Sequence, residues 1–147
     1  MPPFHASFEP IRVLLIHDDL IGALHLRLAI EMSPIPCVVD GVENSVMALR
    51  SLCRSIRAGS RPPDMGIFEC DLRESASQAI LRLALKSPEL SSARWIVLGD
   101  GDDPEQEARA SELGAGGFIA KPVRASDLPR IGRDLGRIWN ENVAAAG

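Results

Sequence analysis

The sequence predicts an α/β protein of the (βα)5 class, a doubly wound five-stranded parallel sheet. Short apolar runs of strand length alternate five times with longer amphipathic runs of helix length. This alternation favours parallel pairing, because neighbouring parallel strands need a crossover connection between them. A chain of 147 residues, 46% hydrophobic and 24% charged, is long enough for one domain with its own core.

The first two units follow each other closely. The run IRVLLI, residues 11–16, is the first expected strand, and a helix follows over about residues 20–32. The run PCVVD, residues 36–40, is the second strand, and its helix covers about residues 44–57. Each helix can return the chain to the sheet as a right-handed crossover.

The third and fourth units have the same order. MGIF, residues 65–68, precedes a helix over about 75–86, and RWIVL, residues 94–98, precedes a helix over 104–113. Pro104 suits the first turn of that last helix, where an amide N–H has no partner within the helix. The sequence therefore continues the same alternation.

The fifth unit consists of the strand GFIA, residues 117–120, and a helix over about 126–140. Ser126 and Asp127 suit an N-cap and an acid in the first turn of this helix. We expect one domain over residues 11–140, between a disordered lead and a flexible tail. The expected lead and tail are residues 1–10 and 141–147.

Composition and charge exclude several function classes. No apolar run reaches the roughly 18 residues that a membrane span needs, and the start MPPFHASFEP lacks the pattern of a signal peptide. We therefore expect a cytoplasmic protein without a membrane partner. A net charge of −4 leaves no basic footprint for nucleic acid. Three cysteines without CxxC spacing are expected to be reduced thiols: Cys37, Cys53 and Cys70.

Polar residues follow the expected strands. In an open parallel sheet, the ligand crevice lies outside the carboxyl ends of the strands, where the strand order reverses. Acids from two strands facing one lysine from a third would form a compact charged pocket there. The candidate residues after strands one, three, four and five are His17 and Asp18, Glu69 and Asp71, Gly99, and Lys121.

From about Ile11 to Trp139 the chain resembles the CheY-like receiver domains of bacterial two-component response regulators. The motifs VLLIHDD, PPDMGIFE and ELGAGGFIAKPV carry the resemblance. Gly99 lies 30 residues after Glu69, and Lys121 lies 22 residues after Gly99, which are the family's usual separations. The long loop before the third strand and the late tryptophan resemble the phytochrome-associated single-domain regulators. The resemblance implies the strand order 2-1-3-4-5.

Three residues match the family's pattern. Asp18 stands where a family acid binds Mg²⁺, and Lys121 stands where the family's lysine pairs with the phosphoryl group. Phe118 occupies the position of the aromatic switch residue. The resemblance implies these roles for them.

Three other residues depart from the pattern: His17 replaces an acid, Glu69 replaces the phosphoacceptor aspartate, and Gly99 replaces a Ser or Thr. The Glu69 carboxylate lies one methylene further out than that of Asp, about 1.5 Å, and misplacement of about 1 Å can cost roughly 100-fold in rate. Mg²⁺ prefers oxygen ligands, which weakens the case for it at this site. We expect a pseudo-receiver that is not an enzyme, requires no cofactor and acts through protein–protein interaction.

Alternatives for the pocket remain open. Asp71 lies on the same side of an extended chain as Glu69, so either residue could be a phosphoacceptor that works with Mg²⁺. One imidazole and two carboxylates, from His17, Asp18 and Glu69, would also suit Zn²⁺ or Mn²⁺. In the interpretation that we favour, Glu69 is a fixed negative charge that Lys121 meets across the pocket.

The resemblance also implies partners. A sensor histidine kinase, of phytochrome type, or another signalling protein is the expected partner. In receivers, the face that corresponds to residues 104–113, 117–120 and the last helix commonly forms dimers. We therefore expect any homodimer to use this face.

Overall fold

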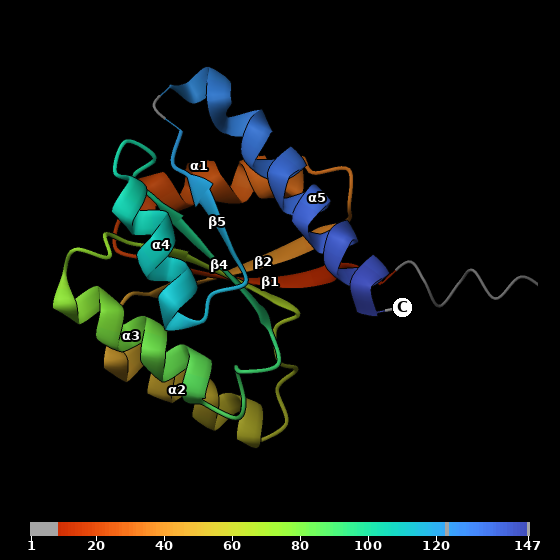
Figure 1. The fold of residues 1–147 in the computed structure, drawn as a ribbon. Helices are drawn as coiled ribbons and strands as arrows, with labels where there is room; N and C mark the ends of the chain where they lie inside the picture. The colour runs from red at the N-terminus through yellow and green to blue at the C-terminus, as the bar shows by residue number, and fades with distance from the viewer. Residues whose placement is uncertain (1–8, 123, 147) are drawn as a thin grey trace, which may run out of the picture.

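The computed structural model describes residues 9–122 and 124–146, and within these ranges it has the predicted (βα)5 architecture (Figure 1). Strands and α-helices alternate from the first element to the last. Their bounds are β1 (Ile11–His17), α1 (Leu20–Glu31), β2 (Cys37–Glu43), α2 (Val46–Arg57), β3 (Met65–Glu69), α3 (Ser75–Lys86), β4 (Arg94–Gly99), α4 (Pro104–Leu113), β5 (Gly117–Ala120) and α5 (Leu128–Ala146). The predicted order of elements is confirmed.

The five strands form one parallel sheet in the order β2-β1-β3-β4-β5, as predicted. The chain turns to one side of β1 to form β2 and then crosses to the other side to form β3. The strand order therefore reverses between β1 and β3, which is where such sheets bind their ligands. The register sets Glu69 opposite Leu98 and Gly99 opposite Ala120, so these strand ends meet at one edge.

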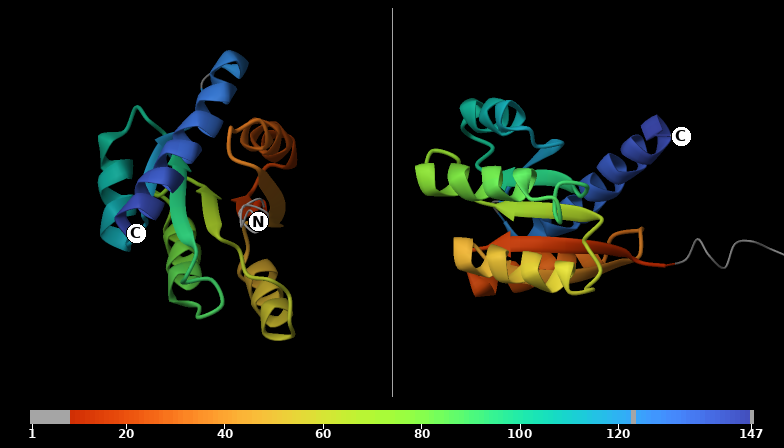
Figure 2. Two further views of the ribbon diagram at one scale, coloured as in Figure 1. Left: turned by 90° about the vertical axis from the view of Figure 1, so that its right-hand side faces the viewer. Right: turned by 90° about the horizontal axis from the view of Figure 1, so that it is seen from below.

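Helices cover both faces of the sheet (Figure 2). Helices α1 and α5 pack on one face, whereas α2, α3 and α4 pack on the other. Successive side chains of a strand point to opposite faces. Met65 and Ile67 therefore belong to the α1–α5 side, and Phe68 belongs to the α2–α3 side. Glu69, the next residue, points to the α1–α5 side.

The largest differences from the predicted bounds are in β2 and α5. Strand β2 runs to Glu43, beyond the expected end at residue 40, because it pairs with β1 along its whole length. A 3₁₀ turn over Ala125–Asp127 precedes α5, so Ser126 is not the N-cap of that helix. Pro129 fits the first turn of a helix that begins at Leu128.

The last helix continues to Ala146, so residues 141–146 extend it and do not form a separate tail. The alanines of this segment are the best helix formers among the amino acids. The expected lead, residues 1–10, lies outside the described residues except for Glu9 and Pro10. Within the described ranges, no helix has both the length and the apolar character that crossing a bilayer requires.

Candidate functional site

The predicted pair of Glu69 and Lys121 lies at the carboxyl edge of the sheet. Glu69 is the last residue of β3, and Lys121 directly follows β5. Lys121 Nζ lies 3.6 Å from Glu69 Oε1, and the Lys121 amide donates to the Gly99 carbonyl at 2.8 Å. The expectation that Lys121 meets Glu69 across the pocket is therefore confirmed.

The Glu69 carboxylate is buried more deeply than its partner. Its side chain is 12% exposed, against 39% for Lys121. Glu69 Oε2 is fully buried and, among residues 9–122 and 124–146, has no hydrogen-bond partner. Burial raises the pKa of Glu69, the Lys121 charge opposes this rise, and the negative charges of Asp18 and Asp19 add to it. Desolvation thus outweighs the ion pair, as is common for partly buried pairs.

A cavity of about 260 Å³ adjoins the pair, between α1 and the beginning of α5. Glu69 and Lys121 lie in its wall, together with the apolar side chains of Leu26, Leu98 and Leu128. Much of the surface around the buried carboxylate is therefore apolar. This accounts for the large desolvation of Glu69.

His17 and Asp18 do not join Glu69 as the metal-site hypothesis requires. The His17 ring lies over β2, where its Nε2 would be 3.2 Å from a Cβ added at Gly41. Asp18 is exposed, and the next residue, Asp19, caps α1 by accepting from the Ile21 amide at 3.1 Å. The His17 ring is thus directed away from Glu69, and Asp18 acts on Glu69 only through its charge.

A metal site would need the predicted ligands to converge. Among the described residues, no group of three or more His, Cys, Asp or Glu side chains is arranged to hold one. Of the predicted ligands, His17 faces Gly41 and Glu69 is paired with Lys121. We assign no Mg²⁺-dependent step to this pocket.

Gly99 and Phe118 are in close contact on the α2–α3 side of the sheet. A Cβ added at Gly99 would lie 3.0 Å from Phe118 Cε2. The ring thus fills space that a Ser or Thr side chain would otherwise need. The lack of a side chain at residue 99 keeps the aromatic residue packed against the sheet.

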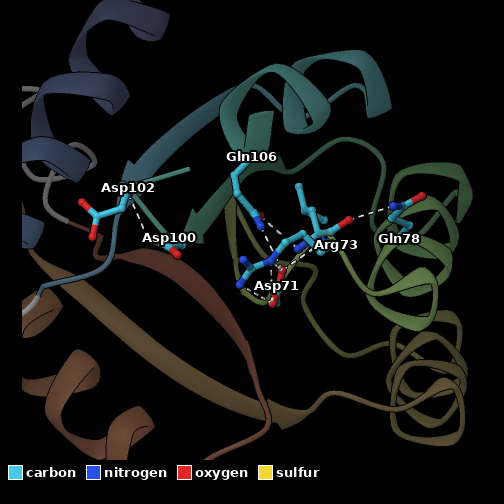
Figure 3. Close-up of polar contacts among 7 residues, drawn as sticks. Asp71, Arg73, Gln78, Asp100, Asp102 and Gln106 are labelled. Carbon is cyan, nitrogen blue, oxygen red and sulfur yellow. Dashed lines mark hydrogen bonds and ion pairs between the residues drawn. The ribbon is translucent and has the colours of Figure 1, made fainter. Parts of the chain in front are cut away.

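Asp71, the alternative acceptor, is held in a separate network (Figure 3). Its Oδ1 accepts from the Arg73 amide, from Arg73 Nε and from Gln106 Nε2, each at 2.9 Å. Its Oδ2 accepts from Arg73 Nη2 at 2.9 Å. The hydrogen bonds from Arg73 and then from Gln106 hold the pKa of Asp71 well below its usual range. Asp71 is thus an anchor of the loop after β3.

Gln106 is the structural residue that the sequence analysis missed. It lies on α4, is 2% exposed, and accepts from the Leu72 amide at 3.0 Å while it donates to Asp71. Gln78 of α3 donates to the Leu72 carbonyl at 2.7 Å. The spacing of Gln106 and Ala110 could have indicated its burial, because the two residues lie one turn apart on the buried face of α4. A polar residue on such a stripe indicates a buried hydrogen bond.

Cys70 is in the state that the sequence predicted, and the acidic residues of the run GDGDD, residues 99–103, lie in a loop. Cys70 is a free, buried thiol whose pKa is raised to about 12 by desolvation, so it is not a reactive nucleophile. Asp100 accepts from the Asp102 amide at 2.9 Å (Figure 3). Asp103 caps α4 by accepting from the Glu105 amide at 3.0 Å. The run GDGDD is therefore a turn followed by a helix cap.

No protein-family model matches the chain, and no curated protein matches it. Solved structures do. The phosphorylated cyanobacterial phytochrome response regulator RcpA has a TM-score of 0.70 at 19% identity, over 91% of this chain and 96% of that chain. The response regulator RPA3017, from red light signaling in R. palustris, has a TM-score of 0.69 at 18% identity, over 88% and 93%. The chemotaxis response regulator CheY4 of Vibrio cholerae has a TM-score of 0.65 at 15% identity, over 88% and 99%.

These similarities cover 88–91% of this chain and 93–99% of the solved chains. The chain therefore has the fold of CheY-like response regulator receiver domains, including those associated with phytochromes. The predicted fold is confirmed.

Proposed function

We propose that this protein is a receiver-type module of two-component signal transduction that acts by protein–protein interaction, with Glu69 as a fixed charge in place of the phosphoacceptor aspartate. Its partner would be a sensor histidine kinase or another signalling protein. The likeness to regulators described as phytochrome response regulators favours a kinase of phytochrome type.

The observation that carries this proposal is the Glu69–Lys121 pair next to Gly99. Lys121 already has a carboxylate partner at 3.6 Å, and residue 99 has no hydroxyl group with which to bind a phosphoryl oxygen. Phosphoryl transfer depends on positioning and charge neutralisation. In this pocket the hydroxyl group is absent and the lysine is already paired, so the chemistry favours a permanent state over a phosphorylation cycle.

The alternative function, a working phosphoacceptor at Asp71, has less support. Both Asp71 oxygens accept hydrogen bonds, and its strongest partner is the Arg73 guanidinium. An attack on a phosphoryl group would require this carboxylate to leave Arg73 and Gln106. The charges of Lys121, Asp18 and Asp19 shift the pKa of Glu69, whereas the charge of Arg73 shifts the pKa of Asp71.

Incubation with acetyl phosphate and Mg²⁺, followed by intact mass and peptide mapping, tests the proposal. We expect no added phosphoryl mass on the wild-type protein while a typical receiver, treated alongside, is phosphorylated. An added mass that disappears in Asp71→Asn would establish the alternative acceptor. A mass that disappears in Glu69→Gln would make Glu69 a working acceptor and would also contradict the proposal.

The surface of α1 supports an interaction role. Leu20, Ile21, Leu24, Leu28 and Met32 are all at least 51% exposed. They lie at spacings of three and four residues, so they share one face of the helix and its C-cap. A contiguous exposed apolar face commonly marks a site of protein interaction. A helical partner on this face would lie next to the Glu69 cavity, which α1 also lines.

The face of α4, β5 and α5 suits self-association. Helix α4 exposes Glu105 and Glu107, and α5 exposes Arg133. Opposite charges on one face can meet across a two-fold axis. Sedimentation at low and high salt would test this: a dimer that uses these charges should weaken as salt rises.

A further inference from the structure

Positive charge is concentrated on α2, α3 and their following residues, although the whole chain is acidic. Residues 45–63 and 75–88 contain six basic residues and no Asp or Glu. The net charge of the chain is −4. The two helices lie side by side on one face of the sheet (Figure 1), so their charges share one surface. This surface is positively charged, whereas the chain as a whole is negatively charged, and it is separate from the Glu69 pocket.

A groove of about 300 Å³ runs between α2 and the end of α3. Arg50, Arg54 and Arg57 line one side of it. Their spacing of four and then three residues places them on one face of α2. Leu83, which is half-buried, and Pro88, which is exposed, line the other side, above the buried Leu49 and Cys53. The groove therefore combines a row of guanidinium groups with an apolar floor.

One end of the groove already holds a carboxylate. Arg57 Nη1 donates to Glu89 Oε1 at 2.8 Å, and the Glu89 side chain is only 11% exposed. An arginine of this row therefore binds a largely covered carboxylate next to the apolar floor. Guanidinium groups suit carboxylates because several N–H donors lie in one plane.

The other two arginines have no such partner. In the described part of the chain, no ion pair joins Arg50 or Arg54 to another residue. Both residues are exposed. The residues outside the described ranges, 1–8, 123 and 147, include no Asp or Glu. Two guanidinium groups one helical turn apart are thus available next to a covered ion pair.

We propose that this groove docks an acidic amphipathic helix of a partner protein, with two carboxylates one turn apart on Arg50 and Arg54. Apolar side chains of the same helix would cover the accessible apolar surface of Leu83 and Pro88. An amphipathic helix in a groove is a common mode of recognition. This second interaction surface does not depend on the state of Glu69.

Charge and size favour a protein over nucleic acid in this groove. A nucleic acid would meet the field of a chain with a net charge of −4 and a pI near 5.4. Its phosphates need an extended basic stripe, whereas this groove has three arginines, one of which is occupied by Glu89. A phosphate backbone would make no favourable contact with the apolar floor, whereas the leucines of an amphipathic helix would pack against it.

A labelled synthetic helix tests the proposal through fluorescence anisotropy. The probe carries two Glu residues one turn apart next to a row of Leu, and matched peptides carry Gln or Lys in place of Glu. We expect the Glu peptide to bind the wild-type protein and to weaken as salt rises. Arg50→Glu with Arg54→Glu should weaken this binding by at least about tenfold and should make the Lys peptide the better ligand.

Arg133→Glu is the matched control, because Arg133 is exposed on α5 and, among the described residues, has no ion pair. It should change the affinity for the Glu peptide by less than about twofold. Equal binding of the Glu and Gln peptides, or an equal loss in Arg133→Glu, would overturn the proposal. So would a lack of binding to the wild type, or tighter binding of duplex DNA that depends on Arg50 and Arg54. The acetyl phosphate assay reads a different site, so the two proposals can fail separately.

Discussion

At the residue scale, Glu69 illustrates how burial can outweigh an ion pair. Its Oε1 lies 3.6 Å from Lys121 Nζ, yet its Oε2 is buried and has no partner in the part of the chain that the structure describes. The pKa of Glu69 is raised because desolvation is the largest effect on it. A carboxyl group with a raised pKa binds its proton more tightly in the folded than in the unfolded chain.

This makes the stability of the protein pH-dependent in a definite direction. Above the usual pKa of Glu, 4.5, the unfolded chain loses this proton while the folded chain keeps it. The free energy of unfolding of the wild type should therefore fall, relative to Glu69→Gln, as pH rises from 4.5 to the raised pKa of the folded state. Urea unfolding at a series of pH values measures the difference.

Lys121→Met gives the control for the same experiment. It removes the charge that opposes the rise in the pKa of Glu69, so the window of falling stability should extend to higher pH. Wild type and Glu69→Gln with parallel pH dependences would contradict the interpretation.

Gly99 gives a second prediction at this scale. A Cβ there would lie 3.0 Å from Phe118 Cε2, so Gly99→Thr should displace the ring and lower the free energy of unfolding by about 1–3 kcal/mol. In Phe118→Ala the added side chain has room, so the same substitution should cost less. A double-mutant cycle measured by thermal unfolding gives the coupling between the two sites. Strictly additive effects would show that the ring does not limit residue 99.

At the scale of elements, Gln106 joins α4 to the loop after β3. Its amide accepts from Leu72 and donates to Asp71, and both contacts are covered because Gln106 is 2% exposed. These two hydrogen bonds of Gln106 therefore help to fix the position of α4, in addition to its apolar contacts.

Gln106→Leu should loosen this connection. It leaves the Leu72 amide without its acceptor, which costs about 1–3 kcal/mol for a buried donor. We expect faster amide hydrogen exchange in residues 70–74 and in α4, with little change in α1. Glu107→Gln, an exposed change on the same helix, serves as the control. Unchanged exchange of α4 in Gln106→Leu would contradict this role.

The packing of α5 on α1 depends on a glycine. A Cβ added at Gly132 would lie 2.7 Å from the Ala29 carbonyl oxygen, whereas one at Gly136 would meet only side chains at 3.6–3.8 Å. Gly132→Ala should therefore separate the helices and cost about 1–3 kcal/mol. Gly136→Ala should be neutral or stabilising by up to about 1 kcal/mol, because Ala favours a helix. Chemical denaturation of the two variants compares them, and equal effects would contradict the close approach.

At the scale of the whole molecule, one sheet supports two apolar layers. Leu15 and Ile67 belong to the layer under α1 and α5, and Phe68 and Val97 belong to the layer under α2 and α3. Alternate residues of the same strands supply both layers. The loss of one layer would therefore expose the sheet on which the other depends.

We expect the two layers to unfold together. Trp95 packs in the α2–α3 layer and Trp139 packs against the α1–α5 layer, so each tryptophan reports on one side. The variants Trp139→Phe and Trp95→Phe each leave one reporter. Adding Phe68→Ala to each should lower the stability by about 3–5 kcal/mol and shift both fluorescence transitions equally. Two different midpoints would show that the layers unfold separately.

Much of the fold could be predicted because it depends on local patterns. The alternation of apolar runs and amphipathic runs identified every strand and α-helix, and α3, α4 and β5 have the predicted bounds. The edge strand β2 was harder, since residues 41–43 include a glycine and an acid that do not read as a strand. Their pairing with β1 decided the outcome, and such pairing is a contact between distant parts of the chain.

The site was predictable in part. Spacing alone brought Glu69, Gly99 and Lys121 together, because the carboxyl ends of adjacent parallel strands meet at one edge. The direction of each side chain was not predictable. The His17 ring contacts Gly41 of β2, and Asp71 binds Arg73 of its own turn and Gln106 of α4. Such contacts depend on how the elements pack, which the spacing of residues along the chain does not give.

The sequence by itself determined the order of elements, the parallel sheet and the set of residues at its carboxyl edge. These follow from periodicity and from spacing along the chain, which are properties of the order of residues. The tertiary structure decided which of those residues act together. It buried one oxygen of Glu69, placed Phe118 against Gly99 and collected the arginines of α2 in a groove with Glu89. Burial, charge pairing and contact distance depend on which surfaces meet, and only the packed chain specifies that.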